Sequence, residues 1–123
     1  MVDIKRQLLD AVIGFLGDKS SKLSEISLRA ETKVIDDYYK GQMKACFEIA
    51  DIIVGYVEIT CPKRKINQKD FVVLINNIQV LIAQTIEDSM CNSDGLYDCF
   101  LKGKEDLYRE VKEILEDYLY MGD

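Results

Sequence analysis

The sequence contains no histidine and no tryptophan, and proline occurs once in 123 residues. Without histidine, the chain lacks the side chain that enzymes use most often as a general base near neutral pH. It also cannot build a mixed cysteine–histidine zinc site. Glycine-rich phosphate-binding and dinucleotide-binding motifs are missing from the sequence as well. We therefore expect a protein that is not an enzyme and has no cofactor.

Cysteine is scarce, and no two of the four cysteines have the CxxC spacing of a metal or redox motif: Cys46, Cys61, Cys91 and Cys99. We expect reduced thiols, buried or partly exposed, and neither a metal site nor a disulfide. Residues 1–17 carry charges among their apolar positions and lack the continuous apolar run of a secretory signal. Both observations predict a cytoplasmic protein.

Positive charge is in deficit, with 16 basic against 22 acidic residues and a net charge of −6. An acidic surface repels the phosphate backbone, so direct binding of nucleic acid is not expected. The longest charge-free stretch is too short and too rich in amides to span a bilayer. With 48% hydrophobic residues, residues 1–123 are expected to form a single folded domain.

The charge-free stretch is residues 71–86, and its apolar residues recur at helical spacing. This pattern predicts a helix over about residues 68–90 that is apolar on most sides. Such a helix must be covered on most sides, either by its own chain or by a second copy. We therefore predict an all-α fold, a bundle of about four main helices with this third helix at its centre.

Helix-terminating residues give the remaining boundaries. The first helix is expected to begin after Asp3 as N-cap and to end near Leu16, because Gly17 follows. A polar connector over residues 18–23 then leads to a long second helix, from Ser24 to about Ile59, with a bend near Gly41.

The second half of the chain is read in the same way. Pro62 ends the second helix, and Asn67 with Asp70 forms a capping box for the third. A turn is predicted at residues 91–95, followed by a short apolar piece and, after Gly103, a last helix that acts as a solvated lid.

Four amides interrupt the apolar third helix: Asn76, Asn77, Gln79 and Gln84. A buried amide needs a hydrogen-bonding partner and so fixes the register of a helix interface. One interpretation is therefore an oligomer interface, in a homo-oligomer formed through the second and third helices. The alternative is that the amides mark an exposed face.

One compact group of basic residues precedes and opens the third helix, where free backbone N–H groups favour an anion. A phosphate-containing small molecule is a candidate ligand, bound with the help of a residue from the last helix. The residues are Lys63, Arg64, Lys65, Lys69 and Arg109. The alternative is a solvated loop whose charges keep the protein soluble.

The quartet Glu48-Ile49-Ala50-Asp51 is similar to one half of the magnesium-binding signature of all-α nucleoside triphosphate pyrophosphatases. The resemblance implies that Glu48 and Asp51 hold Mg²⁺ for a phosphate-releasing reaction. The acid-rich upstream half of the signature is missing around Glu25 and Glu31. The alternative is a charged solvent face with lysine partners, and we expect no metal site.

Residues 38–42, YYKGQ, together with residues 47–53, FEIADII, resemble a pattern common in short phage proteins. The resemblance implies a phage-encoded accessory or anti-defence factor in the host cytoplasm, which inhibits a host protein or sequesters a nucleotide signal. The leading hypothesis is therefore a non-enzymatic, acidic, helical binding protein. The pyrophosphatase is the alternative.

Overall fold

The computed structural model describes residues 3–90 and 98–121, which form four helices and no strand. They are α1 (Ile4–Leu28), α2 (Lys33–Thr60), α3 (Gln68–Met90) and α4 (Cys99–Tyr118). The all-α bundle predicted from the sequence is confirmed. The predicted turn at residues 91–95 and Cys91 lie outside the described residues. None of the four described helices has the length and hydrophobicity needed to span a bilayer.

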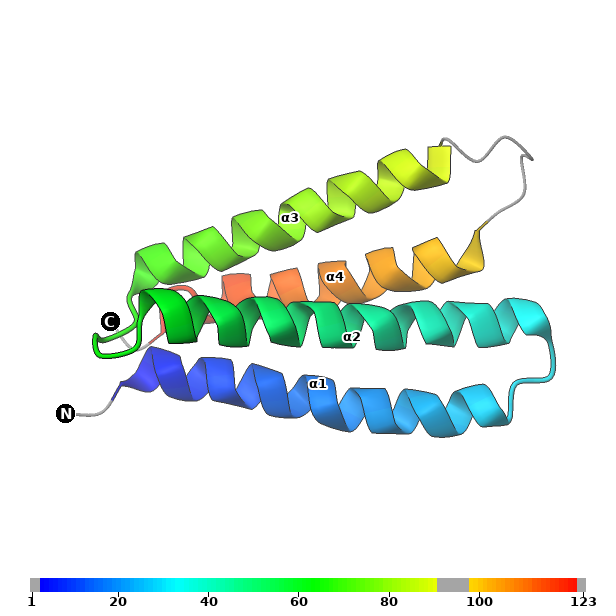
Figure 1. Ribbon diagram of the computed structural model, residues 1–123, viewed down its shortest axis with the longest axis horizontal. Coiled ribbons are helices and arrows are strands. Elements are labelled where there is room, and N and C mark those ends of the chain that lie inside the picture. The colour runs from blue at the N-terminus through cyan, green and yellow to red at the C-terminus, as the bar shows by residue number, and fades with distance from the viewer. Residues whose placement is uncertain (1–2, 91–97, 122–123) are drawn as a thin grey trace.

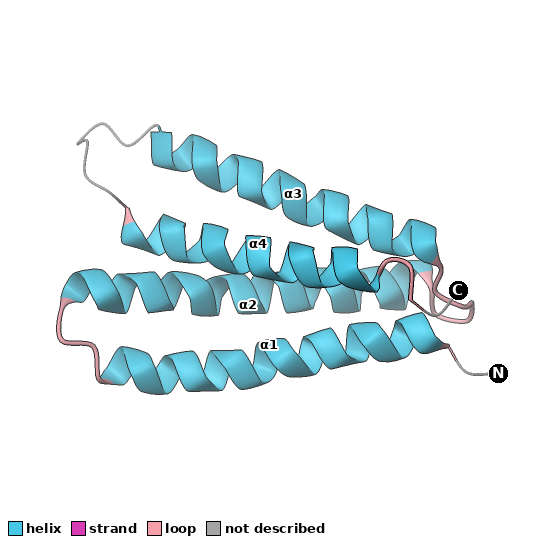
Figure 2. Cartoon of the chain, turned by 180° about the vertical axis from the view of Figure 1, so that it is seen from behind, coloured by secondary structure: helices cyan, strands magenta, loops and turns pink. Residues whose placement is uncertain are grey.

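The helices α2 and α4 form the middle of the bundle, and α1 and α3 lie on opposite sides of this pair (Figure 1). α1 packs mainly against α2, whereas α3 packs mainly against α4. The view from behind shows the same order, with α3 and α1 as the outer helices (Figure 2). The outer faces of α1 and α3 therefore point away from each other.

Two glycines allow α2 and α4 to approach closely. A Cβ atom on Gly41 of α2 would overlap the backbone carbonyl of Phe100, and one on Gly103 of α4 would overlap that of Tyr38. Both positions are buried. Gly41 was expected to bend the second helix, but it lies inside a continuous α2 and makes room for α4.

The core is built from one apolar stripe on each helix, with residues three or four positions apart. The α3 stripe is Phe71, Leu74, Ile78 and Ile82, each fully buried. The α4 stripe is Leu107, Tyr108, Val111 and Leu115. The boundaries predicted for the third helix, residues 68–90, agree with α3.

The structure corrects the first two predicted helices. α1 continues through Gly17 and the polar residues 18–23 as far as Leu28, and α2 begins after Thr32, whose side chain accepts a hydrogen bond from Ile35 N. A Cβ on Gly17 would meet no atom within 4 Å. Buried Leu23 anchors the extra turns to the core, and this packing outweighs the weak helix propensity of the glycine and serines.

The two later helices exchange the roles that the sequence suggested. α4 was expected to be a solvated lid, yet it contacts both α2 and α3 along its length. α3 was expected at the centre, yet Val72, Val73 and Val80 on its outer side are 43%, 39% and 54% exposed. The reason is that α4 has two buried faces because of Gly103, whereas α3 has one.

Candidate interaction surface

The outer face of α3 is exposed and carries no charge between residues 71 and 86. All four amides of the predicted oligomer interface, Asn76, Asn77, Gln79 and Gln84, lie on it together with exposed valines. The structure thus brings these amides together on one surface and leaves them open in the single chain. We call this surface, Val72, Val73, Asn76, Asn77, Gln79, Val80, Ala83 and Gln84, the α3 outer face.

Within the α3 outer face, Val73, Asn77, Val80 and Gln84 follow one another at intervals of four, three and four residues. This is the spacing of the positions that meet a partner helix in a coiled coil. An asparagine at such a position fixes register and oligomer size at some cost in stability. Nothing in the described chain covers this line.

A groove of about 400 Å³ runs between the α3 outer face and α4. Its apolar part is Val72, Ile75 and Leu119, and its rim includes the ion pair of Lys112 with Glu116, 3.0 Å apart. The groove widens the uncharged surface toward α4 and offers depth for an inserted side chain.

The predicted phosphate site is built differently from the expectation. The Asp70 carboxylate accepts four hydrogen bonds: from two guanidinium nitrogens of Arg64 at 2.8 and 2.7 Å, from the Tyr56 hydroxyl at 2.6 Å and from the Asn67 backbone N–H at 2.8 Å. In return, the Asn67 side chain accepts a bond from Asp70 N, which confirms the predicted capping box. The anion at the start of α3 is therefore the chain's own carboxylate.

Electrostatics agree with this geometry. The Arg64 guanidinium, helped by Tyr56 and Asn67, holds the pKa of Asp70 well below its usual range despite burial. Burial and the bond to Asp70 raise the pKa of Tyr56 to about 12. Asp70 is 2% exposed, so an ionised carboxylate here requires these partners.

Of the other predicted phosphate ligands, the three lysines lie near Arg64 and Arg109 does not. Lys63, Lys65 and Lys69 are exposed near Arg64. Arg109 lies in the middle of α4, about 14 Å of helix from its end, and pairs with Glu105 at 2.9 Å. The structure thus joins four of the five basic residues at one end of the bundle and leaves Arg109 elsewhere.

Glu48 and Asp51, the predicted half of a magnesium signature, have different surroundings in the structure. The Glu48 carboxylate accepts the Tyr108 hydroxyl at 2.7 Å and pairs with Lys104 at 3.2 Å, so it joins α2 to α4. Burial and this hydrogen bond raise the pKa of Tyr108. Asp51, three residues further along α2, is exposed. In residues 3–90 and 98–121, no cluster of three or more potential metal-binding side chains occurs.

Sequence reasoning missed Lys5, which is 2% exposed. Its ammonium donates to the carbonyl oxygens of Leu119 and Met121, at 2.9 and 2.5 Å, and lies 5.4 Å from the centre of the Phe71 ring. A cation at the end of α4 meets carbonyls that lack helical partners. The signal was present: Lys5 is four residues before buried Leu9 on the same helical stripe.

Three of the four cysteines lie among the described residues, and two of them, Cys46 and Cys61, are buried. Cys46, Cys61 and Cys99 form no disulfide with one another. Burial raises the pKa of Cys46 to about 11 and also raises that of Cys61. A protonated, enclosed thiol is a poor nucleophile, so Cys46 and Cys61 act as small apolar core residues.

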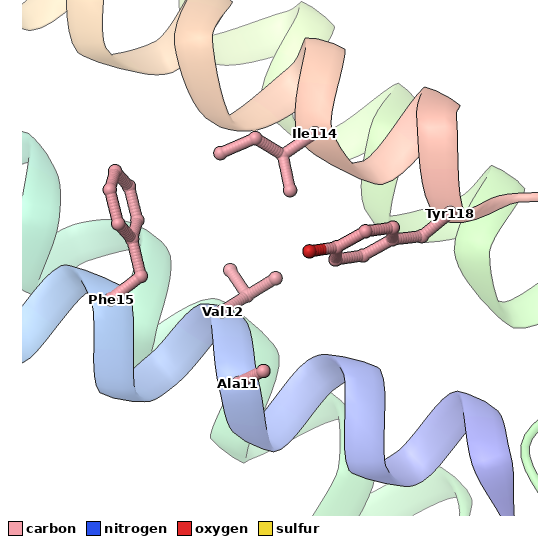
Figure 3. A pocket seen from close by; sticks show the side chains of 5 residues that line it. All are labelled: Ala11, Val12, Phe15, Ile114 and Tyr118. Atoms are coloured by element: carbon pink, nitrogen blue, oxygen red, sulfur yellow. The ribbon is translucent and has the colours of Figure 1, made fainter.

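A small hollow between α1 and α4 has a volume of about 120 Å³ and is lined by Ala11, Val12, Phe15, Ile114 and Tyr118. The Tyr118 hydroxyl points into it beside Val12 (Figure 3). It is smaller than the pockets that usually hold cofactors or metabolites. Comparison of the chain with known protein families, curated proteins and solved structures found no match.

Proposed function

We propose that this chain is a non-enzymatic binding protein. It pairs with a second copy of itself through the α3 outer face and acts by occupying a binding site on a partner protein. The observation that carries the proposal is the uncharged, partly apolar surface that α3 leaves open in a chain of which 31% of residues are charged. Exposed surface of this kind marks interaction sites on folded proteins.

Charge favours a second copy as the occupant of the α3 outer face. Two chains with a net charge of −6 repel each other, and the repulsion is smallest where neither contributes a charge. The α3 outer face meets that condition over residues 71–86. An amide both donates and accepts hydrogen bonds, so Asn77 is self-complementary across a two-fold axis.

The size of the α3 outer face implies a reversible dimer. Its central line from Val73 to Gln84 spans three helical turns, about 17 Å. With the groove beside α4, this places the contact at the small end of specific protein interfaces. Association and dissociation are therefore expected within the concentration range of ordinary solution measurements.

Partner binding follows from the same composition. An acidic helical protein suits a basic site on another protein, which is the mode of action that the phage-like pattern implies. Inhibition of a host protein is accordingly proposed ahead of sequestration of a nucleotide signal. The Arg64–Asp70 pair supports this order, because the guanidinium that would bind a phosphate already holds a carboxylate.

The dimer is tested by light scattering over a hundredfold range of protein concentration. Wild-type protein is expected to shift from 14.1 kDa toward twice that mass. Val80→Lys, which places a charge on the α3 outer face, should remain a monomer throughout. Val34→Lys is the matched control, since Val34 is exposed to a similar extent, 59% against 54%, but lies at the start of α2.

Two results would contradict the dimer. One is a wild-type mass that stays at the monomer value over the whole range. The other is an equal effect of Val80→Lys and Val34→Lys, which would mean that net charge and not the α3 outer face controls association.

A further inference from the structure

A second open surface lies on the opposite side of the bundle, between α1 and α2. Two adjoining hollows of about 210 Å³ each share Ile13. The first is lined by Arg6, Leu9, Asp10, Ile13, Val54, Val57 and Glu58, and the second by Ile13, Leu16, Gly17, Ser20, Cys46, Phe47 and Ala50. We call the two together the α1–α2 groove.

The α1–α2 groove has an apolar floor and an apolar outer edge. Leu9, Leu16 and Cys46 form the buried floor. Phe47 and Val54 stand at the edge, 61% and 37% exposed, which is unusual for a phenylalanine in a chain with a filled core. Small residues on α1 keep the groove open, since a Cβ on Gly17 would meet nothing within 4 Å.

Acidic side chains border this apolar surface. Asp51 and Glu58 alternate with Phe47 and Val54 along one line of α2, and Asp10 faces them from α1. In the part of the chain that the structure describes, none of the three acids has an ion-pair partner.

The basic residue that lines the α1–α2 groove is already engaged. The Arg6 guanidinium donates to the carbonyls of Cys61 and Arg64, at 2.8 and 2.9 Å. Lys44 lies on α2 one turn before Phe47 and offsets negative charge at that end of the groove. The excess of negative charge is therefore greatest at the other end, near Glu58. Charge complementarity therefore calls for a cationic occupant.

We infer that the α1–α2 groove binds an amphipathic helix of a partner protein, with an apolar stripe flanked by lysine or arginine. This rests on the proposed function, for which it names the partner. The groove walls are helices whose backbone groups are already paired, so an extended peptide would find no hydrogen bonds there, whereas a helix satisfies its own. Residues 46–58 span about 18 Å, which fits three to four turns of a ligand helix.

The outward directions of α1 and α3 make the two surfaces compatible. α1 and α3 lie on opposite sides of the α2–α4 pair (Figure 1), so a dimer joined through the α3 outer face would leave the α1–α2 groove of each copy open to solvent. The groove is therefore available in monomer and dimer alike, and its occupation can be measured separately from the protein's mass.

The test uses two synthetic helical peptides with the same leucine stripe, one flanked by lysines and one by glutamates. Binding is followed by backbone amide NMR of the labelled full chain. We expect the lysine peptide to bind at least tenfold more tightly and to shift the signals of Ile13, Phe47 and Val54. Gly17→Leu should fill the groove and weaken binding at least tenfold. Gly14→Leu, the same change on the outer side of α1, should leave it within twofold.

A second pair of variants tests the charges. Asp51→Lys with Glu58→Lys should abolish the preference for the lysine peptide, whereas the charge-matched Glu25→Lys with Glu113→Lys should keep it. The inference is overturned if neither peptide binds, if both bind equally, if Gly17→Leu has no effect or if the shifts fall on α3.

Concentration-dependent shifts at Ile13 and Phe47 without peptide would also overturn the inference, because a second copy would then occupy the α1–α2 groove. The two proposals can fail separately. A monomer whose groove signals respond to the lysine peptide would remove the α3 dimer alone. A dimer without such a response would remove the groove inference alone.

Discussion

Helices α3 and α4 bury similar apolar stripes but present different surfaces on their remaining sides. The outer side of α4 carries ion pairs such as Lys102–Asp106 at 2.9 Å and Arg109–Glu105 at 2.9 Å. The outer side of α3 carries valines and amides without a charge between residues 71 and 86. The side chains of α4 are suited to water, whereas those of α3 are suited to a partner.

Two properties of a helix are easily confused in a sequence: the need of its surface to be covered, and a place in the middle of the bundle. An absence of charge indicated that α3 should be covered, but it did not say by what. A helix can lie in the middle of the bundle only if a neighbouring helix can approach it closely. In α4 the residue that allows this approach is Gly103. Of α3 and α4, the helix that lies in the middle of the bundle is thus α4, which has more charges and a glycine.

The largest effect is expected from breaking the α2–α4 contact. In Gly103→Ala the new Cβ overlaps the Tyr38 carbonyl, and the helices must separate. We expect a loss of about 3 kcal/mol in the free energy of unfolding, at the upper end of the cost of overpacking. Urea denaturation followed by circular dichroism measures it.

Gly55→Ala is the control for that substitution. It lies in α2 with no atom within 4 Å of the added Cβ, so better helix propensity should stabilise the protein by about 0.5–1 kcal/mol. If Gly103→Ala also stabilised the protein, the close approach of α2 and α4 would not exist.

A matched pair of valines, one on each helix, tests the difference between α3 and α4. Val111→Ala on α4 removes a fully buried side chain and should cost about 2 kcal/mol in the free energy of unfolding. Val80→Ala on α3 should cost below about 0.5 kcal/mol in dilute solution.

Protein concentration then separates the two valine variants. The loss in free energy of unfolding of Val80→Ala relative to wild type should grow as the protein is concentrated, because a dimer stabilises the folded state by mass action. That of Val111→Ala should stay constant. Equal, concentration-independent losses would show that the chain itself covers Val80.

A further effect, smaller than those of Gly103→Ala and Val111→Ala, concerns how α3 is attached at its first turn. The folded-state pKa of Asp70 lies below its ordinary value of 3.8. Its contribution is therefore fully present above pH 4–5 and is lost as the pH falls through the folded-state pKa. We expect Asp70→Asn to lower the free energy of unfolding at pH 7 by about 1.5 kcal/mol.

Acid titration distinguishes this role from a general loss of packing. The difference between wild type and Asp70→Asn should shrink as the pH is lowered below 4, because the unfolded wild-type chain then takes up a proton at Asp70 that the folded carboxylate, with its lowered pKa, does not. A difference that is independent of pH would assign the loss to shape and not to charge.

Local sequence signals predicted the features that depend on neighbouring residues. The N-cap Asp3, the capping box of Asn67 and Asp70 and the boundaries of α3 follow from contacts within one turn. The role of glycine did not follow in the same way. A glycine that interrupts a helix and one that admits a second helix look alike in sequence. Gly17 was therefore taken as a helix end and Gly103 was placed before the last helix, whereas both lie inside helices.

The candidate surfaces also combine features that neighbouring residues determine with features that depend on distant parts of the chain. The amides of α3 could be placed on one helix from their spacing, but their exposure depends on where α4 packs. The basic residues near Arg64 could be grouped from their adjacency. The engagement of Arg64 with Asp70 could not, because the carboxylate is held by several groups at once, among them Tyr56 from the preceding helix.

Three tyrosine hydroxyls donate to carboxylates: Tyr38 to Asp106, Tyr56 to Asp70 and Tyr108 to Glu48. Since the chain has no tryptophan, tyrosine alone determines its ultraviolet absorption above 280 nm. Formation of tyrosinate on alkaline titration is delayed at Tyr56 and Tyr108, whose pKa values are raised. The protein therefore contains its own optical probe: native structure near the C-terminal end of α2 and at the contact of α2 with α4 can be followed by spectrophotometry, without a label.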